Sequence, residues 1–161
     1  MNCVNAKNAE GKFMSKQPES TLVGEMSAMD SFALLKMDKD AALIDVRTQA
    51  EWSYVGVADL AELGKRPLFH QWQVFPSMQT DVDFVPRLKA ALAAAGAGVD
   101  APLLFLCRSG VRSLAAGQAM AAAGHSRCIN VTGGFEGPPD ANQHRGRISG
   151  WKASVLPWTQ P

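Results

Sequence analysis

Residues 102–124 read PLLFLCRSGVRSLAAGQAMAAAG, and this stretch decides the fold. Its first part, Pro102 to Leu106, is a short apolar run typical of a strand that is buried on both faces. The small residues from Ser113 to Ala123 then predict a helix, which Gly124 ends. A short polar loop beginning at Cys107 joins the two elements. A strand that passes through a short loop into a helix is typical of an α/β fold.

The remainder of the chain alternates strands and helices in the same way. Leu22-Val23 predicts part of a short first strand, and the apolar runs at residues 42–46 and 128–131 predict two buried strands. Residues 67–75 are expected to form a strand followed by a turn. Because strands alternate with helices, we predict an α/β domain with a mostly parallel central sheet of about five strands and helices on both faces.

Local signals place three further helices along the chain. Ser27 opens the first, since it is an N-cap residue type followed three positions later by Asp30. Thr48 and Glu51 have the spacing of a capping box, which predicts a short helix after the second strand. The third helix is expected over residues 81–95, where apolar residues recur at helical spacing. The stripe consists of Phe84, Leu88 and Leu92.

Composition limits the class of protein. The 161 residues are 47% hydrophobic and 19% charged, which is typical of a globular domain, and the net charge is +1. This charge gives no reason to expect a nucleic acid or an anionic membrane as a partner. Residues 1–21 are predicted to form a flexible polar arm and residues 22–161 the domain. With no apolar run long enough to span a bilayer and no signal peptide, we expect a cytoplasmic protein.

Cysteine, histidine and tryptophan residues outside the loop are interpreted as structural. The three cysteines are Cys3, Cys107 and Cys128, an odd number whose spacing fits neither a disulfide framework nor a metal site. Cys128 lies in a predicted strand and is expected to pack as a small hydrophobe. The three histidines are dispersed, with no identifiable partners. Aromatic residues after the second strand, Phe69, Trp72 and Phe75, are candidates for the border of a binding pocket.

The loop from Cys107 has the properties of an anion-binding site. It follows the carboxyl end of a predicted strand, where α/β proteins bind their ligands. Its backbone N–H groups and the start of the next helix favour negative charge, and Arg108 and Arg112 add two cations. These features favour a cysteine thiolate, whereas the alternative is a buried structural cysteine. The predicted binding residues are Arg108, Ser109, Gly110, Val111, Arg112 and Ser113.

Four segments in this order resemble the single-domain rhodaneses, which are sulfurtransferases. They are residues 43–47 with Glu51-Trp52, the loop at 107–113, the stretch 130–135 and the closing stretch 150–157. Together they extend from about Leu22 to Gln160. One departure is that Gly56 is followed by Val-Ala-Asp-Leu, whereas the family usually has a Gly-His-Ile-x-Gly-Ala-like stretch. The resemblance implies a rhodanese-like α/β fold.

The resemblance also implies a reaction. Cys107 would be the catalytic nucleophile that takes a sulfur atom from an anionic donor such as thiosulfate and passes it to a thiol or to cyanide. Arg108 and Arg112 would bind the donor, and no cofactor or metal would be required. Asp45, Arg47 and Glu51 would be supporting residues, either in a polar network that joins Arg47 to Glu51 or Asp45, or as a surface ion pair of little energetic value.

Two alternatives remain from the sequence. The pattern Cys-x-x-x-x-Arg is one residue shorter than the loop of the related dual-specificity phosphatases, so phosphatase activity ranks lowest. The long segments 57–75 and 138–147 favour a second alternative, a sulfur-carrier or interaction module whose partner is a protein thiol. The identity of the donor stays open, although Arg108 beside the cysteine favours thiosulfate over mercaptopyruvate.

Overall fold

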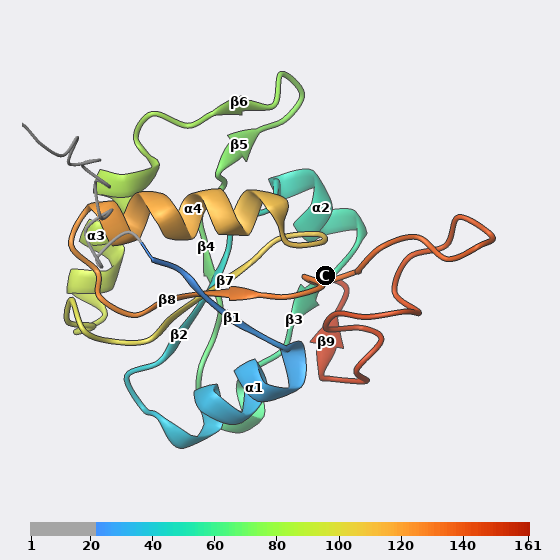
Figure 1. The fold of residues 1–161 in the computed structure, drawn as a ribbon, viewed down its shortest axis with the longest axis horizontal. Helices are drawn as coiled ribbons and strands as arrows, with labels where there is room; N and C mark the ends of the chain where they lie inside the picture. The colour runs from blue at the N-terminus through green and yellow to red at the C-terminus, as the bar shows by residue number, and fades with distance from the viewer. Residues whose placement is uncertain (1–21) are drawn as a thin grey trace, which may run out of the picture.

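A computed structural model describes residues 22–161 (Figure 1), and the arm predicted for residues 1–21 lies outside them. Within these residues the central sheet has five strands in the order β1-β8-β7-β2-β4, and every neighbouring pair is parallel. The predicted α/β fold is therefore confirmed. The strands are β1 (Gly24–Met26), β2 (Ala42–Asp45), β4 (Leu68–Phe69), β7 (Leu103–Leu106) and β8 (Cys128–Val131).

Helices cover both faces of the sheet (Figure 1). Consecutive side chains of a strand point to opposite faces, so Leu104 and Leu106 join the core beneath α1 (Ala28–Met37). Leu103 and Phe105 join the core beneath α3 (Phe84–Ala94) and α4 (Val111–Ala122). The two cores explain why β7 is apolar at every position. No helix within residues 22–161 combines the length and the apolar character needed to cross a membrane.

Several boundaries differ from the prediction. β1 begins two residues after Leu22, and α4 begins at Val111 rather than at Ser113. The segment expected to be a loop after Gly56 contains β3 (Val57–Ala58) and a 3-10 turn, η2 (Ala61–Leu63). β3 pairs with β9 (Trp158–Thr159), about a hundred residues later, and local sequence patterns carry no signal for such a pairing.

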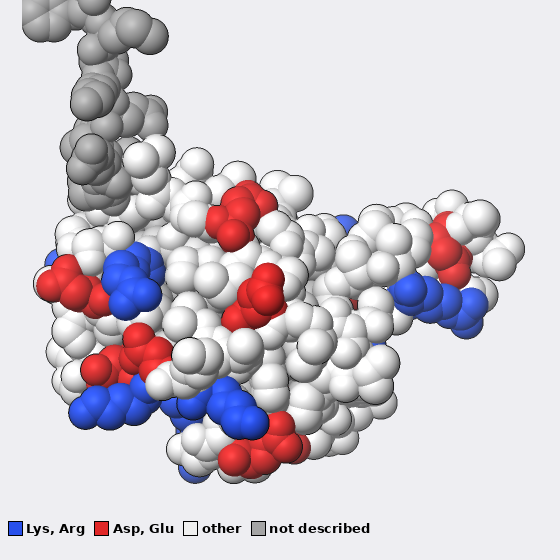
Figure 2. All heavy atoms as spheres, turned by 60° about the horizontal axis from the view of Figure 1, so that its bottom comes forward, with Lys and Arg blue, Asp and Glu red and all other residues white. Residues whose placement is uncertain are grey.

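The segment predicted as a strand and a turn contains two separate strands. β4 adds to the edge of the central sheet, whereas β5 (Gln73–Val74) forms a small antiparallel hairpin with β6 (Gln79–Thr80). The hairpin projects away from the sheet on the side of α2 (Gln49–Tyr54) and α4 (Figure 1). On the face shown in Figure 2, acidic and basic side chains are interspersed and do not form an extended surface of one sign.

Candidate active site

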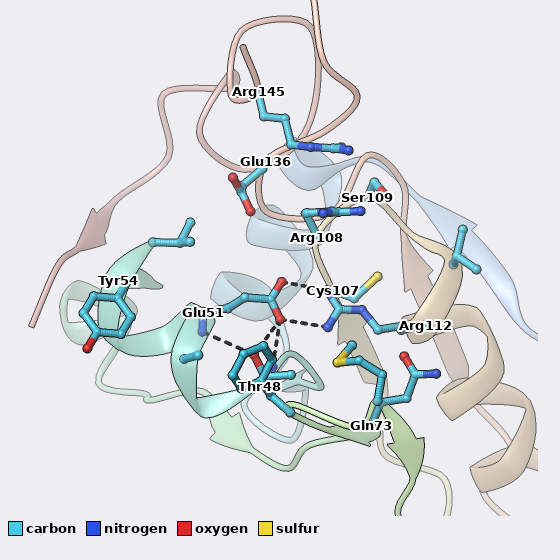
Figure 3. Close-up of a pocket in the computed structure, with 15 residues that line it drawn as sticks. Thr48, Glu51, Tyr54, Gln73, Cys107, Arg108, Ser109, Arg112, Glu136 and Arg145 are labelled. Atoms are coloured by element: carbon cyan, nitrogen blue, oxygen red, sulfur yellow. Dashed lines mark hydrogen bonds and ion pairs between the residues drawn. The ribbon is translucent and has the colours of Figure 1, made fainter. Parts of the chain in front are cut away.

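The sulfur of Cys107 lies at the centre of the loop between β7 and α4 (Figure 3). Its Sγ accepts a hydrogen bond from the backbone N–H of Gly110 at 3.1 Å and lies 3.1 Å from the Oγ of Ser113. Gly110 has φ +118°, a conformation that glycine adopts readily, and it directly precedes α4. The residue is 1% exposed. The loop therefore surrounds the sulfur with donors that stabilise negative charge.

Asn130 of β8 connects both groups that contact the sulfur. Its Nδ2 donates to the carbonyl of Gly110 at 3.1 Å, and its Oδ1 lies 2.6 Å from the Oγ of Ser113. The serine hydroxyl has a single hydrogen, so it donates either to Asn130 or to Cys107. Asn130 belongs to the motif of residues 130–135, which alone predicts no contact for its side chain. The only sequence signal for this role is that motif, in which Asn130 stands three residues before the first glycine of the turn.

The glycine turn after β8 is hydrogen-bonded to the cysteine loop. The N–H of Phe135 donates to the carbonyl of Cys107 at 2.8 Å, and the N–H of Glu136 donates to the carbonyl of Arg108 at 3.0 Å. Gly134 has φ +61°, and a Cβ atom there would lie 2.5 Å from the carbonyl oxygen of Cys107. The close approach of the two backbones therefore requires glycine at this position.

We expect Gly134→Ala to lower the free energy of unfolding by about 3 kcal/mol, because it combines left-handed strain with a backbone clash. Gly64→Ala is the matched control, since Gly64 has φ +66° and no atom within 4 Å of the added Cβ. Gly64→Ala should lower the free energy of unfolding by only about 1 kcal/mol, which is the effect of the left-handed strain alone. Urea unfolding of both variants measures the difference. If both variants lost the same free energy of unfolding, the predicted clash at Gly134 would be wrong.

Glu51 and Arg112 form a bidentate ion pair beside the sulfur. Nη1 of Arg112 lies 2.8 Å from Oε2 of Glu51, and Nη2 lies 2.7 Å from Oε1. The predicted capping box is present, because Thr48 N–H donates to Glu51 at 3.0 Å and Thr48 Oγ1 accepts from the N–H of Glu51. The helix cap thus fixes the carboxylate that orients Arg112.

Asp45 and Arg47 form a separate buried pair. Nη2 of Arg47 lies 2.7 Å from Oδ2 of Asp45 and donates to the carbonyl of Gly56 at 2.8 Å. The guanidinium carbon lies 4.2 Å from the ring centroid of Phe135. Both side chains are almost fully buried, so the surface-pair interpretation is wrong. Of the two partners predicted for Arg47, Asp45 is confirmed and Glu51 is wrong, because Arg112 pairs with the carboxylate of Glu51.

A pocket of about 860 Å³ opens in front of the cysteine. Its charged side is formed by the loop residues and by segment 138–147, which contributes Arg145 (Figure 3). Nη1 of Arg145 donates to the carbonyl of Gly137 at 2.7 Å. Among the described residues, neither Arg108 nor Arg145 has a carboxylate within 4.0 Å. Within the described part of the chain, these two cations therefore have no direct ion-pair partner of the kind that Arg112 has, and the carboxylate of Glu136 lines the same pocket. Sequence reasoning missed Arg145, which belongs to no motif.

A family model of the rhodanese-like domain matches residues 29–137. The chain belongs to the rhodanese-like family. An uncharacterized protein of Rickettsia prowazekii, RP600, is 34% identical over 137 residues, which cover 85% of this chain and 98% of that protein. Two thirds of the chain fall within the match, and it includes the cysteine loop and the start of the glycine turn.

Solved structures of other proteins share the fold of this rhodanese-like chain. The crystal structure of Rv0390 from M. tuberculosis has 35% sequence identity and a TM-score of 0.76, covering 86% of this chain and 98% of that one. The solution structure of the polysulfide-sulfur transferase homodimer from Wolinella succinogenes has 21% sequence identity and a TM-score of 0.53. The match covers 85% of this chain and 78% of that one. At that level of identity the second likeness concerns the fold alone.

Apart from Phe75, the other candidate residues of the rhodanese-like domain do not line the pocket. Cys128 is buried, and desolvation raises the pKa of its thiol to about 12, as expected for a packed residue. Of the three aromatic candidates for the pocket border, only Phe75 lines it. Trp72 packs edge-on against Phe84 instead, with ring centroids 5.1 Å apart. The pocket-lining residues include none of the histidines, and Cys3 lies outside the described residues.

The Glu51–Arg112 pair predicts a pH dependence of stability. Burial disfavours the charged form of Glu51, but hydrogen bonds from Arg112 and Thr48 outweigh it and lower its pKa from 4.5 to about 2. Because the folded pKa lies below the unfolded value, this contribution is complete above pH 4.5 and is lost as the pH falls toward 2. Urea unfolding at pH values between 4.5 and 2 should show that the free energy of unfolding falls more steeply with decreasing pH for the wild type than for Glu51→Gln. Parallel profiles would contradict the prediction.

Proposed function

We propose that this rhodanese-like domain is a sulfurtransferase that moves a sulfane sulfur from an anionic donor, such as thiosulfate, to a thiophilic acceptor. A persulfide of Cys107 would be the intermediate. The observation that carries the proposal is the cradle around Sγ, which receives the N–H of Gly110 and faces the hydroxyl of Ser113. Membership of the family supports this chemistry. The free thiols of Cys107 and Cys128 support a reducing compartment such as the cytoplasm.

In the first half-reaction, the Cys107 thiolate attacks the outer sulfur of thiosulfate. A new S–S bond forms, the S–S bond of the donor breaks, and its electron pair leaves with sulfite. The negative charge that remains on the outer sulfur of the persulfide faces the same loop that held the thiolate. Neither half-reaction needs a metal ion or an organic cofactor, because only a sulfur atom and an electron pair are exchanged.

We assign the binding of the donor's charged group mainly to Arg108 and Arg145. Both line the pocket, and both lack a carboxylate partner among residues 22–161. Arg112 was expected to bind the donor as well, but Glu51 holds both of its terminal nitrogens. We therefore assign Arg112 a positioning role at the start of α4, where its charge faces the sulfur without being the donor's principal ligand.

We expect Arg108→Gln to raise the KM for thiosulfate about tenfold, because a charge-assisted hydrogen bond to the donor is lost. The kcat should change much less, since the cysteine cradle is built from other groups. Arg66→Gln is the matched control, because Arg66 is exposed and does not line this pocket. Steady-state kinetics with varied thiosulfate measure both constants. An unchanged KM in Arg108→Gln would refute the assignment of this residue.

The direct assay is thiocyanate formation from thiosulfate and cyanide with both substrates varied. A persulfide intermediate predicts parallel double-reciprocal lines, because sulfite leaves before cyanide reacts. Turnover with intersecting lines would contradict a free persulfide enzyme. Hydrolysis of an aryl phosphate without any sulfur transfer would favour the phosphatase alternative instead. Transfer to a protein thiol alone, with no small-molecule turnover, would favour the sulfur-carrier alternative.

A further inference from the structure

The pocket is also lined by apolar side chains that the transfer of sulfur from thiosulfate to cyanide does not use. We call this set the apolar wall and define it as Tyr54, Phe75, Met78 and Val111, all of which line the pocket. Their side chains are unusually open to solvent: Tyr54 is 80% exposed, Val111 79% and Phe75 60%. Single exposed apolar residues are common, but four that line one pocket together with Cys107 form a surface available to an apolar ligand.

Separate elements of the fold bring the apolar wall together. Tyr54 ends α2, and Val111 begins α4 (Figure 1). Phe75 and Met78 lie in the turn of the β5–β6 hairpin, where the N–H of Met78 donates to the carbonyl of Val74 at 2.7 Å. Trp72 anchors the base of the hairpin on α3 by its edge-on contact with Phe84. The hairpin is therefore a fixed part of the pocket rather than a detached loop.

The size of the pocket also exceeds the needs of the small substrates. A volume of about 860 Å³ lies within the range of pockets that hold organic ligands of many atoms. Thiosulfate and cyanide have only a few atoms, and neither has an apolar group to bury against an aromatic or aliphatic side chain. The sulfur of Cys107 and the cations of Arg108, Arg112 and Arg145 line the same pocket (Figure 3). The pocket thus offers cations to an anionic donor and exposed apolar side chains to an apolar group.

We propose that the sulfur acceptor is an organic thiol whose apolar body packs against the apolar wall while its sulfur meets Cys107. This inference rests on the proposed function. The acceptor thiolate attacks the outer sulfur of the Cys107 persulfide and forms an S–S bond with it. The bond between that sulfur and Sγ breaks, and its electron pair returns to Cys107 as thiolate. The product is the organic persulfide, and no oxidant or reductant is needed.

The test measures the discharge of a persulfide that has been loaded beforehand. The protein is treated with thiosulfate, desalted, and checked by intact mass for one added sulfur atom. It is then mixed rapidly with benzyl mercaptan or with 2-mercaptoethanol at equal concentrations of thiolate. We expect benzyl mercaptan to discharge the persulfide about tenfold faster, because its ring is buried against the wall. Equal rates for the two thiols would overturn the inference.

Variants connect this preference to the wall. In Phe75→Ala/Met78→Ala, the ratio of the benzyl mercaptan rate to the 2-mercaptoethanol rate should fall about tenfold. Tyr54→Ala, at a more exposed position, should lower the ratio in the same direction. Val82→Ala is the control, because Val82 is 89% exposed but lies outside the pocket. A ratio that stays at the wild-type value in both wall variants would refute the subsite.

Loading the protein with sulfur before adding the thiol distinguishes a failure of the proposed function from a failure of the inference about the acceptor. If the wild-type protein acquires no sulfur from thiosulfate or from a second donor such as inorganic polysulfide, the proposed function fails. If it acquires sulfur and discharges it without preference between the two thiols, the proposed function stands and the inference about the acceptor fails.

Discussion

Cys107→Ser should lower kcat for thiocyanate formation by more than about a thousandfold, since an alcohol in this cradle cannot form the persulfide intermediate. The serine hydroxyl occupies nearly the same space, so the cradle of Gly110 and Ser113 should persist around it. Circular dichroism and urea unfolding should show a folded protein of similar stability.

Cys128→Ala is the matched control for the loss of a cysteine. Cys128 is buried in the core and does not line the pocket, and its thiol donates a hydrogen bond to the carbonyl of His125 at 3.6 Å. Its kcat should stay within about twofold of the wild type, because a packed hydrophobe is being shortened far from the site. If Cys107→Ser kept substantial turnover while Cys128→Ala lost it, the assignment of the nucleophile would be wrong.

Arg47→Met is expected to lower the free energy of unfolding by about 4 kcal/mol, because it leaves the carboxylate of Asp45 buried without its cation. The substitution also removes the donor to the carbonyl of Gly56 and the contact of the guanidinium with Phe135. A loss of this size is a large part of the stability of an ordinary domain. Urea unfolding should show a much lower midpoint with a similar m-value.

Arg127→Met makes the same chemical change at an exposed ion pair. Arg127 lies 3.8 Å from Asp38, and its side chain is half exposed. The expected loss is below about 1 kcal/mol, because solvent screens such a pair. Similar losses for the two variants would show that burial of the Arg47–Asp45 pair has no energetic consequence.

The parts of the molecule that depend on local sequence were predictable. The apolar run before Cys107, the capping box of Thr48 and Glu51, and the stripe of Phe84, Leu88 and Leu92 each became the expected element. These signals act over a few residues, where the periods of strand and helix and the chemistry of a cap suffice. The alternation of the elements then predicted the parallel sheet.

The partners of the charged residues were not predictable in the same way. Glu51 and Arg112 lie 61 positions apart and meet only because α2 and the start of α4 are packed at the same edge of the sheet. The sequence left either Glu51 or Asp45 as the partner of Arg47 and predicted no partner for Arg112. Arg47 turns to Asp45, two residues away, because both side chains are enclosed and need each other's charge.

The features that shape the pocket depend on tertiary structure. Arg145 belongs to a segment without periodicity, and it reaches the pocket because the preceding glycine turn is hydrogen-bonded to the cysteine loop. Phe69, Trp72 and Phe75 were all pocket candidates because they follow the second strand, but only Phe75 lines the pocket. Phe69 packs against Trp52 instead, and Trp72 packs against Phe84. The hydrophobic pattern alone does not distinguish aromatic residues that face a pocket from those that fill a core.

The most direct test of the central claim is the intact mass of the protein after treatment with thiosulfate and removal of the excess donor. We expect the mass of the wild type to increase by one sulfur atom. Peptide mapping should locate this sulfur on Cys107, and cyanide should remove it. The same treatment should leave the mass of Cys107→Ser unchanged. An unmodified wild-type protein, or a sulfur atom carried by Cys3 or Cys128 instead, would contradict the claim.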